Sequence, residues 1–198
     1  QVRGGEVSMI FQEPMTALNP VLRVSEQMFD VILRHQKITP ADAEKLSIQL
    51  LEDMKIQDPQ RVFNAYPHEL SGGMRQRVMI AMAFSCHPKL IVADEPTTAL
   101  DVTVQAQILN LLKERAAATQ TAVLLITHDL AVVAQICDRV YVMYKGKIVE
   151  EGPTRDVIGN PQHAYTRALL NALPEGKTPK SRLETVAAAM IEGGSDKA

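Results

Sequence analysis

Two short apolar runs on either side of a helix-like segment constrain the fold of this chain most. Residues 90 to 93 and 122 to 126 are apolar throughout, as buried strands of a parallel sheet are. Between them, Asp101 precedes a segment with apolar residues at helical spacing, namely Val104, Ile108, Leu111 and Leu112. The two runs start about 30 residues apart, the usual length of one βαβ unit. We therefore predict an α/β fold built on a parallel sheet of buried strands.

The overall composition limits the classes of function. The chain has 198 residues, of which 46% are hydrophobic and 22% are charged, and this is typical of a soluble globular protein. A net charge of -2 gives no basic surface for nucleic acid. Cys86 and Cys137 form no C-x-x-C pair, which favours a reducing compartment without a structural metal. No apolar run is long enough to span a bilayer. Because the first residue is Gln1 rather than methionine, we expect a fragment.

The remaining elements complete the predicted organisation. Residues 6 to 11 predict a short strand, and residues 24 to 84 predict a helical subdomain inserted before the next strand. Within it, Thr39 and Pro40 predict a helix start, with Asp42 in the first turn. Residues 140 to 144 and 147 to 150 predict a hairpin around Lys145 and Gly146, and residues 161 to 173 predict a final helix. We expect one partial domain over residues 1 to 174 and a polar tail over 175 to 198.

Polar side chains follow the three predicted strands of the sheet. Gln12 follows the first strand, Asp94 and Glu95 follow the second, and His128 follows the third. Ligands of parallel α/β sheets bind at the carboxyl ends of the strands, so we expect these side chains to share one rim. Each of them alone is more often an ordinary loop residue, but the joint pattern indicates a site.

A second candidate site lies at the start of the helix that precedes residue 90. Ser71, Gly72 and Gly73 place small residues and backbone N–H groups at a helix N-terminus, where the helix dipole favours anions. The alternative is a simple Ser-Gly-Gly helix cap. The neighbouring residues Met74 to Arg77 and the spacing to residues 90 to 95 favour the anion site.

These residues resemble the motifs of the ATPase subunits of ABC transporters. Residues 9 to 14 resemble the Q-loop, 70 to 76 the signature, 90 to 95 Walker B, 98 to 101 the D-loop, and 127 to 129 the switch histidine. All occur in the order and spacing of the family. The segment from Gln162 to Leu170 resembles the C-terminal extension of the dipeptide, oligopeptide and nickel importers, here placed at residues 161 to 174. The resemblance implies a P-loop NTPase-type parallel sheet, truncated at its N-terminus, with an inserted helical subdomain.

The resemblance implies ATP and Mg²⁺ as cofactors and gives each site residue a role. Ser71, Gly72 and Gly73 would bind the γ-phosphate of ATP held by a partner subunit. Asp94 would help to hold Mg²⁺, partly through water, since this ion keeps much of its hydration shell. Glu95 would orient and deprotonate the attacking water.

Three further residues complete the implied site. His128 would contact the γ-phosphate and hold the water in line with Glu95. Gln12 would reach Mg²⁺ and the water, and its loop would report nucleotide state to the membrane partner. Asp101 is expected to cap the following helix, and the resemblance alone adds a contact across the dimer.

Three departures from the family pattern qualify the resemblance. Met74 replaces the commoner glutamine of the signature, and Ala164 stands where the extension usually has proline. No G-x-x-x-x-G-K-[ST] phosphate loop occurs in the 198 residues. This segment therefore lacks the phosphate-loop lysine and a central strand, and we expect it to be inactive by itself.

The predicted function is ATP hydrolysis that drives import of peptides or related small solutes. The implied partners are a second ATPase subunit or half, two membrane permeases and an extracytoplasmic solute-binding protein, with no nucleic acid. The expected location is the cytoplasmic face of the cell membrane, as a peripheral subunit. The alternatives are a soluble ABC-type ATPase of DNA repair or translation, and a non-catalytic interaction protein that begins at Gln1.

Overall fold

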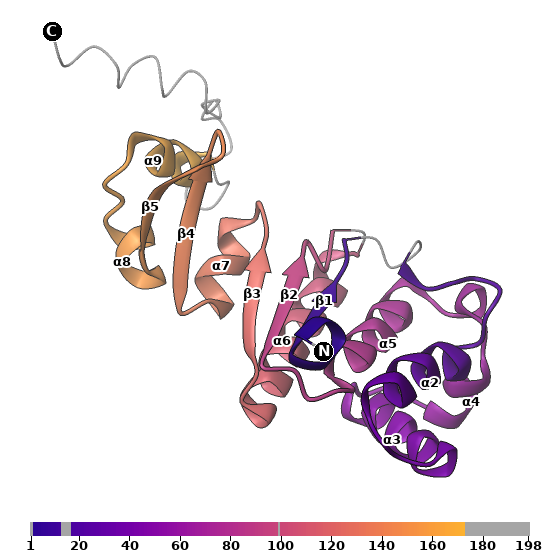
Figure 1. The fold of residues 1–198 in the computed structure, drawn as a ribbon. Coiled ribbons are helices and arrows are strands. Elements are labelled where there is room, and N and C mark those ends of the chain that lie inside the picture. The colour runs from indigo at the N-terminus through magenta and orange to yellow at the C-terminus, as the bar shows by residue number, and fades with distance from the viewer. Residues whose placement is uncertain (1, 13–16, 99, 173–198) are drawn as a thin grey trace, which may run out of the picture. The chain divides into compact units, whose positions relative to one another are not determined.

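The structure is a computed structural model that describes residues 2–12, 17–98 and 100–172. It divides into two compact units, with the division between Ile126 and Thr127. Each unit has its own helices, strands and hydrophobic core (Figure 1). The predicted extent of one ABC domain over residues 1 to 174 stays a prediction.

The first unit contains the predicted parallel sheet. Its strands β1 (Val7–Ile10), β2 (Leu90–Asp94) and β3 (Ala122–Ile126) lie in the order β1-β2-β3, and both neighbouring pairs are parallel (Figure 1). Met9 is paired with Val92, and Val92 with Leu124. A short kinked turn, Val2–Glu6, precedes β1. The βαβ unit predicted from residues 90 to 126 is confirmed.

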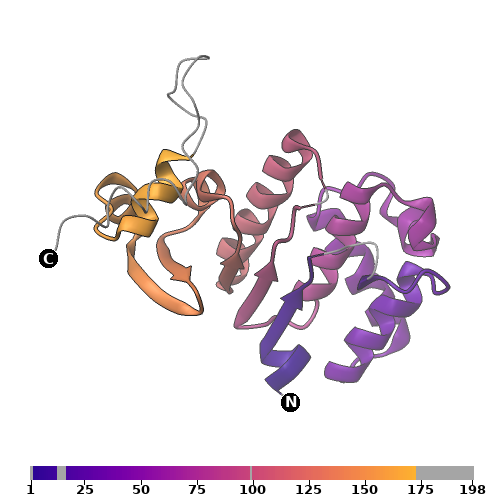
Figure 2. The ribbon, with the colours of Figure 1, turned by 90° about the horizontal axis from the view of Figure 1, so that it is seen from above.

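Within the first unit, the described helices pack on one face of this sheet. Ile10, Ile91 and Ala93 are buried on the face covered by helices α5 (Gly72–Phe84) and α6 (Val102–Thr119), as Figures 1 and 2 show. On the other face, Met9 and Leu124 are 43% and 48% exposed. The prediction that residues 122 to 126 form a buried strand is therefore wrong as to burial. The strand forms, but it lies at the sheet edge with one face unpacked.

A run of helices joins β1 to β2, as predicted for residues 24 to 84. It comprises α2 (Val24–His35), α3 (Pro40–Asp53), α4 (Pro59–Asn64), a 3₁₀ turn (Pro67–Glu69) and α5. The Thr39 hydroxyl caps α3 by accepting the Asp42 N–H, and Pro40 begins the helix, as expected. The apolar faces of these helices join the buried strands in one core, with fully buried side chains that include Met28, Ile32, Leu50, Leu51 and Ile80.

Polar contacts tie α3 to the helices that cover the sheet. The Arg77 side chain in α5 donates to the carbonyl of Met54, which follows α3, at 2.7 Å. Arg115 in α6 forms an ion pair of 2.7 Å with Asp53, and both side chains are only about one-quarter exposed, at 22% and 23%. Partly buried pairs lose less to solvent screening than surface pairs do. The Arg77 contact attaches the end of α3 to α5, and the ion pair of Arg115 attaches it to α6.

The second unit is built around an antiparallel hairpin. It comprises α7 (Leu130–Ile136), β4 (Arg139–Tyr144), β5 (Lys147–Pro153), α8 (Thr154–Gly159) and α9 (Ala164–Asn171). Strands β4 and β5 pair antiparallel, which confirms the predicted hairpin, and Lys145 and Gly146 both have positive φ, as a type I′ turn requires. Val133, Val140, Val142 and Val157 form its core. Helix α9 begins three residues later than predicted, because His163 is extended and caps it by accepting the Tyr165 N–H.

Among the described residues, no helix has both the length and the apolar character needed to cross a membrane.

Candidate functional site

The carboxyl edge of the sheet brings two predicted site residues together. Gln12 lies just beyond β1, and Glu95 follows β2 directly. The Gln12 Nε2 donates a hydrogen bond of 2.9 Å to Glu95 Oε2, although the two residues are 83 positions apart in the chain. The parallel pairing of β1 with β2 creates this contact, because it aligns the carboxyl ends of the two strands.

Glu95 lies in a strained turn that its backbone contacts stabilise. Its φ is 43°, in the left-handed region that non-glycine residues rarely adopt. Its N–H donates to the carbonyl of Ile126 at 2.9 Å, so the turn is attached to the end of β3. Such backbone outliers cluster at functional sites. The turn therefore supports a functional role for this carboxylate.

Glu95 has a further contact, with Thr98, that was not predicted from the sequence. The Thr98 hydroxyl donates to Glu95 Oε2 at 2.8 Å and lies 3.2 Å from the Glu95 carbonyl oxygen. Threonine hydroxyls commonly bond to backbone groups three or four residues earlier, so the position of Thr98 three residues after Glu95 was a usable signal in the sequence.

Asp94 and Gln12 carry oxygen atoms of the kind that Mg²⁺ prefers as ligands, and their role in binding the ion stays a prediction. Asp94 is the last residue of β2 and is partly buried. Gln12 uses its nitrogen to reach Glu95, so that bond does not involve its amide oxygen. Within the described ranges, no three His, Cys, Asp or Glu side chains are grouped to hold a metal. This donor set fits an ion bound largely by water and phosphate oxygens.

The Ser-Gly-Gly segment forms the N-terminus of α5, as predicted. Ser71 is the N-cap, and its hydroxyl accepts the Met74 N–H at 3.3 Å. Ser71 and Gly72 are exposed, and Gly73 is partly buried. A helix N-terminus of this kind presents backbone donors and a positive dipole end to solvent. The structure therefore contains both the helix cap and the exposed surface that the γ-phosphate role needs.

The two glycines also have a packing role. A β-carbon on Gly72 would lie 3.5 Å from Leu100 Cδ2, which is ordinary contact. A β-carbon on Gly73 would lie only 2.9 Å from Val104 Cγ1 in α6. The signature segment therefore lies against the segment that contains Asp101.

Asp101 caps α6, as the sequence predicts. Its Oδ1 accepts the Val104 N–H at 2.9 Å, and its backbone is extended. The side chain is exposed, and its contact across a dimer stays a prediction.

His128 belongs to the second unit, two residues after β3 ends. It is exposed, and it lies between Thr127 and Asp129, whose carboxylate caps α7 by accepting the N–H groups of Ala131 and Val132. Its predicted approach to Glu95 stays a prediction.

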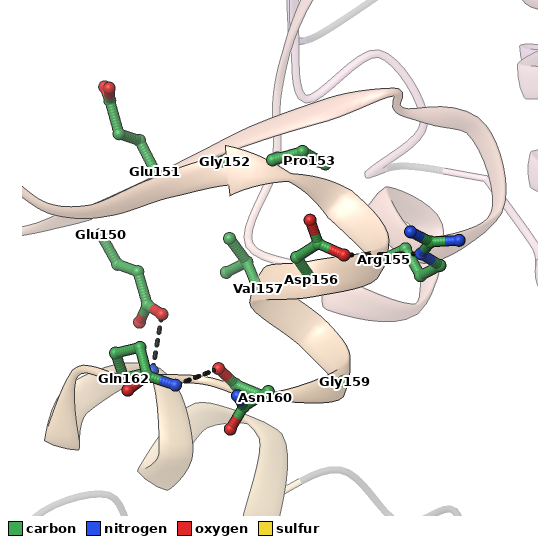
Figure 3. Close-up of a pocket in the computed structure, with 10 residues that line it drawn as sticks. All are labelled: Glu150, Glu151, Gly152, Pro153, Arg155, Asp156, Val157, Gly159, Asn160 and Gln162. Atoms are coloured by element: carbon green, nitrogen blue, oxygen red, sulfur yellow. Dashed lines mark hydrogen bonds and ion pairs between the residues drawn. The ribbon is translucent and has the colours of Figure 1, made fainter.

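An open pocket of about 490 Å³ lies elsewhere, in the second unit (Figure 3). None of the predicted site residues line it. On its wall, the Glu150 carboxylate accepts the backbone N–H groups of Gln162 at 2.7 Å and His163 at 3.0 Å. Burial raises the pKa of Glu150, but these bonds and the Thr166 hydroxyl outweigh it, so that the pKa lies below its ordinary value. The polar groups here attach the segment before α9 to β5, which is a structural role.

Parts of three predicted segments lie outside the described residues. These are residues 13 and 14 of the Q-loop, residue 99 of the D-loop, and the residues from 173 onward.

Comparison with known families covers both units. Residues 1–98 match the ABC transporter family, and residues 149–193 match the C-terminal region of oligopeptide and dipeptide transporters. The probable D,D-dipeptide transport ATP-binding protein DdpD of Escherichia coli (strain K12) is 60% identical over 186 residues, which are 94% of this chain and 57% of the relative. The oligopeptide transport ATP-binding protein OppD of the same organism is 53% identical over 182 residues, with 90% of this chain and 54% of the relative covered.

Solved structures show the same fold. The dimeric, post-hydrolysis structure of the ATP-binding cassette MJ0796 bound to ADP and Pi matches with a TM-score of 0.66 and 28% identity. The match covers 77% of this chain and 64% of that one. The chain spans little more than half the length of the curated relatives, at 57% and 54%. The motifs, the parallel sheet and these matches together show that the chain belongs to the ABC transporter ATP-binding family, in its oligopeptide and dipeptide branch.

Proposed function

We propose that the polypeptide to which this chain belongs hydrolyses ATP to energise the import of peptides or related small solutes. The observation that carries this proposal is the contact between Gln12 and Glu95 at the carboxyl edge of the sheet. It joins the predicted Q-loop residue to the predicted water-orienting acid, at the edge where α/β proteins bind nucleotides.

The residues at this edge divide the work of phosphoryl transfer. Glu95 orients the attacking water and accepts its proton. Its left-handed backbone sets the point from which the side chain extends. Asp94 and the amide oxygen of Gln12 would hold Mg²⁺, which neutralises charge on the phosphates when it is bound. His128 would hold the γ-phosphate and the water. Positioning and charge stabilisation supply most of the catalysis in this chemistry.

The signature segment would complete the site of a second ATPase subunit. Ser71, Gly72 and Gly73 lie at an exposed helix N-terminus, which suits an anionic phosphate group. Asp101 begins the adjacent helix and would contact the same partner. The dimeric state of the MJ0796 cassette bound to ADP and Pi supports this arrangement.

The C-terminal match supports peptides as the transported class. It starts at residue 149 in β5 and includes α9, and the DdpD and OppD relatives are named for dipeptide and oligopeptide transport. The partners would be two membrane permeases and an extracytoplasmic solute-binding protein, with the ATPase bound peripherally at the cytoplasmic face.

The test is Glu95→Gln in the complete polypeptide. The amide keeps the shape of the side chain but cannot accept the proton, so we expect ATP turnover to fall by about two orders of magnitude or more while ATP binding persists. Glu44→Gln is the matched control, because Glu44 is an exposed acid on α3. Wild-type turnover in the Glu95 variant would refute the role of this carboxylate. Uptake of a labelled dipeptide by the reconstituted transporter tests the solute class separately.

A further inference from the structure

We infer that Thr98 is a positioning residue for Glu95, whose hydroxyl orients the carboxylate during turnover. The inference rests on the proposed function, because it assigns Thr98 a part in the step that Glu95 performs. It begins from a shared atom: Glu95 Oε2 accepts from the Thr98 hydroxyl at 2.8 Å and from Gln12 Nε2 at 2.9 Å. Hydrogen bonds to an ionised carboxylate are stronger than those between neutral groups.

The two donors come from different parts of the fold. Gln12 follows β1, 83 residues before Glu95, and its amide is also a proposed ligand of the metal and the water. A rotation of that amide toward the nucleotide would remove its bond to Glu95. Thr98 belongs to the same turn as Glu95, and its N–H donates to the Glu95 carbonyl at 3.3 Å. Thr98 is therefore a donor that could stay with the carboxylate if Gln12 turned away.

The backbone contacts of the turn do not by themselves fix the orientation of the carboxylate. The Glu95 backbone is fixed by its left-handed φ of 43° and by its N–H bond to Ile126. The side chain has further rotatable bonds, which these backbone contacts do not restrain. A hydroxyl on Oε2 limits their rotation, and a misplacement of about 1 Å can reduce turnover by about 100-fold.

Thr98 also has a local role that the test must separate. Its hydroxyl lies 3.2 Å from the Glu95 carbonyl oxygen, and a bond there would stabilise the turn. Because Thr98 is exposed, its replacement by valine opens no cavity in the core. A purely structural role would lower the thermal midpoint of unfolding, whereas a positioning role lowers kcat at an unchanged midpoint.

The experiment compares Thr98→Val with Thr98→Ser in the complete polypeptide. Valine keeps the shape and loses the hydroxyl, and serine keeps the hydroxyl. We expect valine to lower kcat by about 10-fold or more, with KM for ATP and the unfolding midpoint close to wild type. Serine should stay within about twofold of wild type in kcat. Thr103→Val is the matched control, since Thr103 is an exposed threonine on α6.

Each outcome distinguishes the inference from the proposed function. Wild-type kcat in Thr98→Val, with turnover lost in Glu95→Gln, overturns the role of Thr98 and leaves the function intact. The role of Thr98 is also overturned if kcat of Thr98→Val falls only together with its unfolding midpoint. It is overturned as well if Thr98→Ser loses as much kcat as Thr98→Val does. If Glu95→Gln itself retains turnover, the proposed function fails first.

Discussion

Gly73 and Val104 lie so close that a β-carbon on Gly73 would come within 2.9 Å of Val104 Cγ1. Gly73 is the second residue of α5, in the predicted signature segment, and Val104 lies in the first turn of α6, next to the predicted D-loop. Two segments that are both predicted to face a partner subunit are therefore packed directly on each other. Gly73 therefore serves helix packing, and its role in access for phosphate stays a prediction.

A methyl group at position 73 tests the packing role of this glycine. We expect Gly73→Ala to lower the free energy of unfolding by about 1 to 3 kcal/mol, because the new methyl group overpacks against Val104. The additional change Val104→Ala should recover part of this loss. Gly72→Ala is the matched control, because its β-carbon meets Leu100 at an ordinary 3.5 Å. Urea unfolding of Gly73→Ala, Val104→Ala, the double variant and Gly72→Ala measures the effect, and strictly additive losses would contradict direct packing.

Ser71 allows the helix cap and the phosphate contact to be tested separately. Ser71→Asp keeps an oxygen that caps α5, so stability should hold, while the negative charge should repel the partner's γ-phosphate. Ser71→Ala should lower stability by about 1 kcal/mol through loss of the cap. ATP-induced dimerisation of the complete polypeptide, measured by gel filtration in the Glu95→Gln background, should be lost in the aspartate variant. Normal dimerisation of that variant would contradict the phosphate role.

Gln76 is fully buried in α5, and neither polar atom of its amide has a hydrogen-bond partner among the residues that the structure describes. An unpaired buried amide lowers stability, so Gln76→Met should raise the free energy of unfolding by about 1 to 3 kcal/mol. Gln60→Met, at an exposed position on α4, should change it by less than about 0.5 kcal/mol. Destabilisation by the first substitution would indicate that the amide is paired through bound water.

Glu150 should make the attachment of α9 dependent on pH. Because the pKa of Glu150 in the folded state lies below its ordinary value, its stabilising effect is complete above that value and is lost as pH falls through the lowered pKa. We expect the backbone amide signals of Gln162 and His163 to shift only once the pH has fallen below the ordinary pKa of a glutamate, about 4.3. Glu150→Gln should abolish this shift. Glu151→Gln is the control, because that carboxylate faces Arg139 at 3.8 Å instead, and loss of the shift there would contradict the assignment.

The sequence by itself determined the features that depend on neighbouring residues. The caps at Thr39, Ser71 and Asp101 could be predicted because each hydroxyl or carboxylate bonds an N–H three residues ahead. The β2-α6-β3 unit could be predicted because apolar runs and helical spacing are local patterns. The position of Glu95 at the carboxyl edge followed from that unit.

Only the tertiary structure decided the contacts between distant segments. The bond from Gln12 to Glu95 depends on the register of β1 against β2, and the attachment of α9 depends on where the hairpin places Glu150. The packing of Gly73 on Val104 depends on how two helices approach each other. The half-exposed β3 was mispredicted for the same reason. An apolar run predicts that a strand forms. Which side chains of that strand are buried depends on the elements that pack on each face of the sheet.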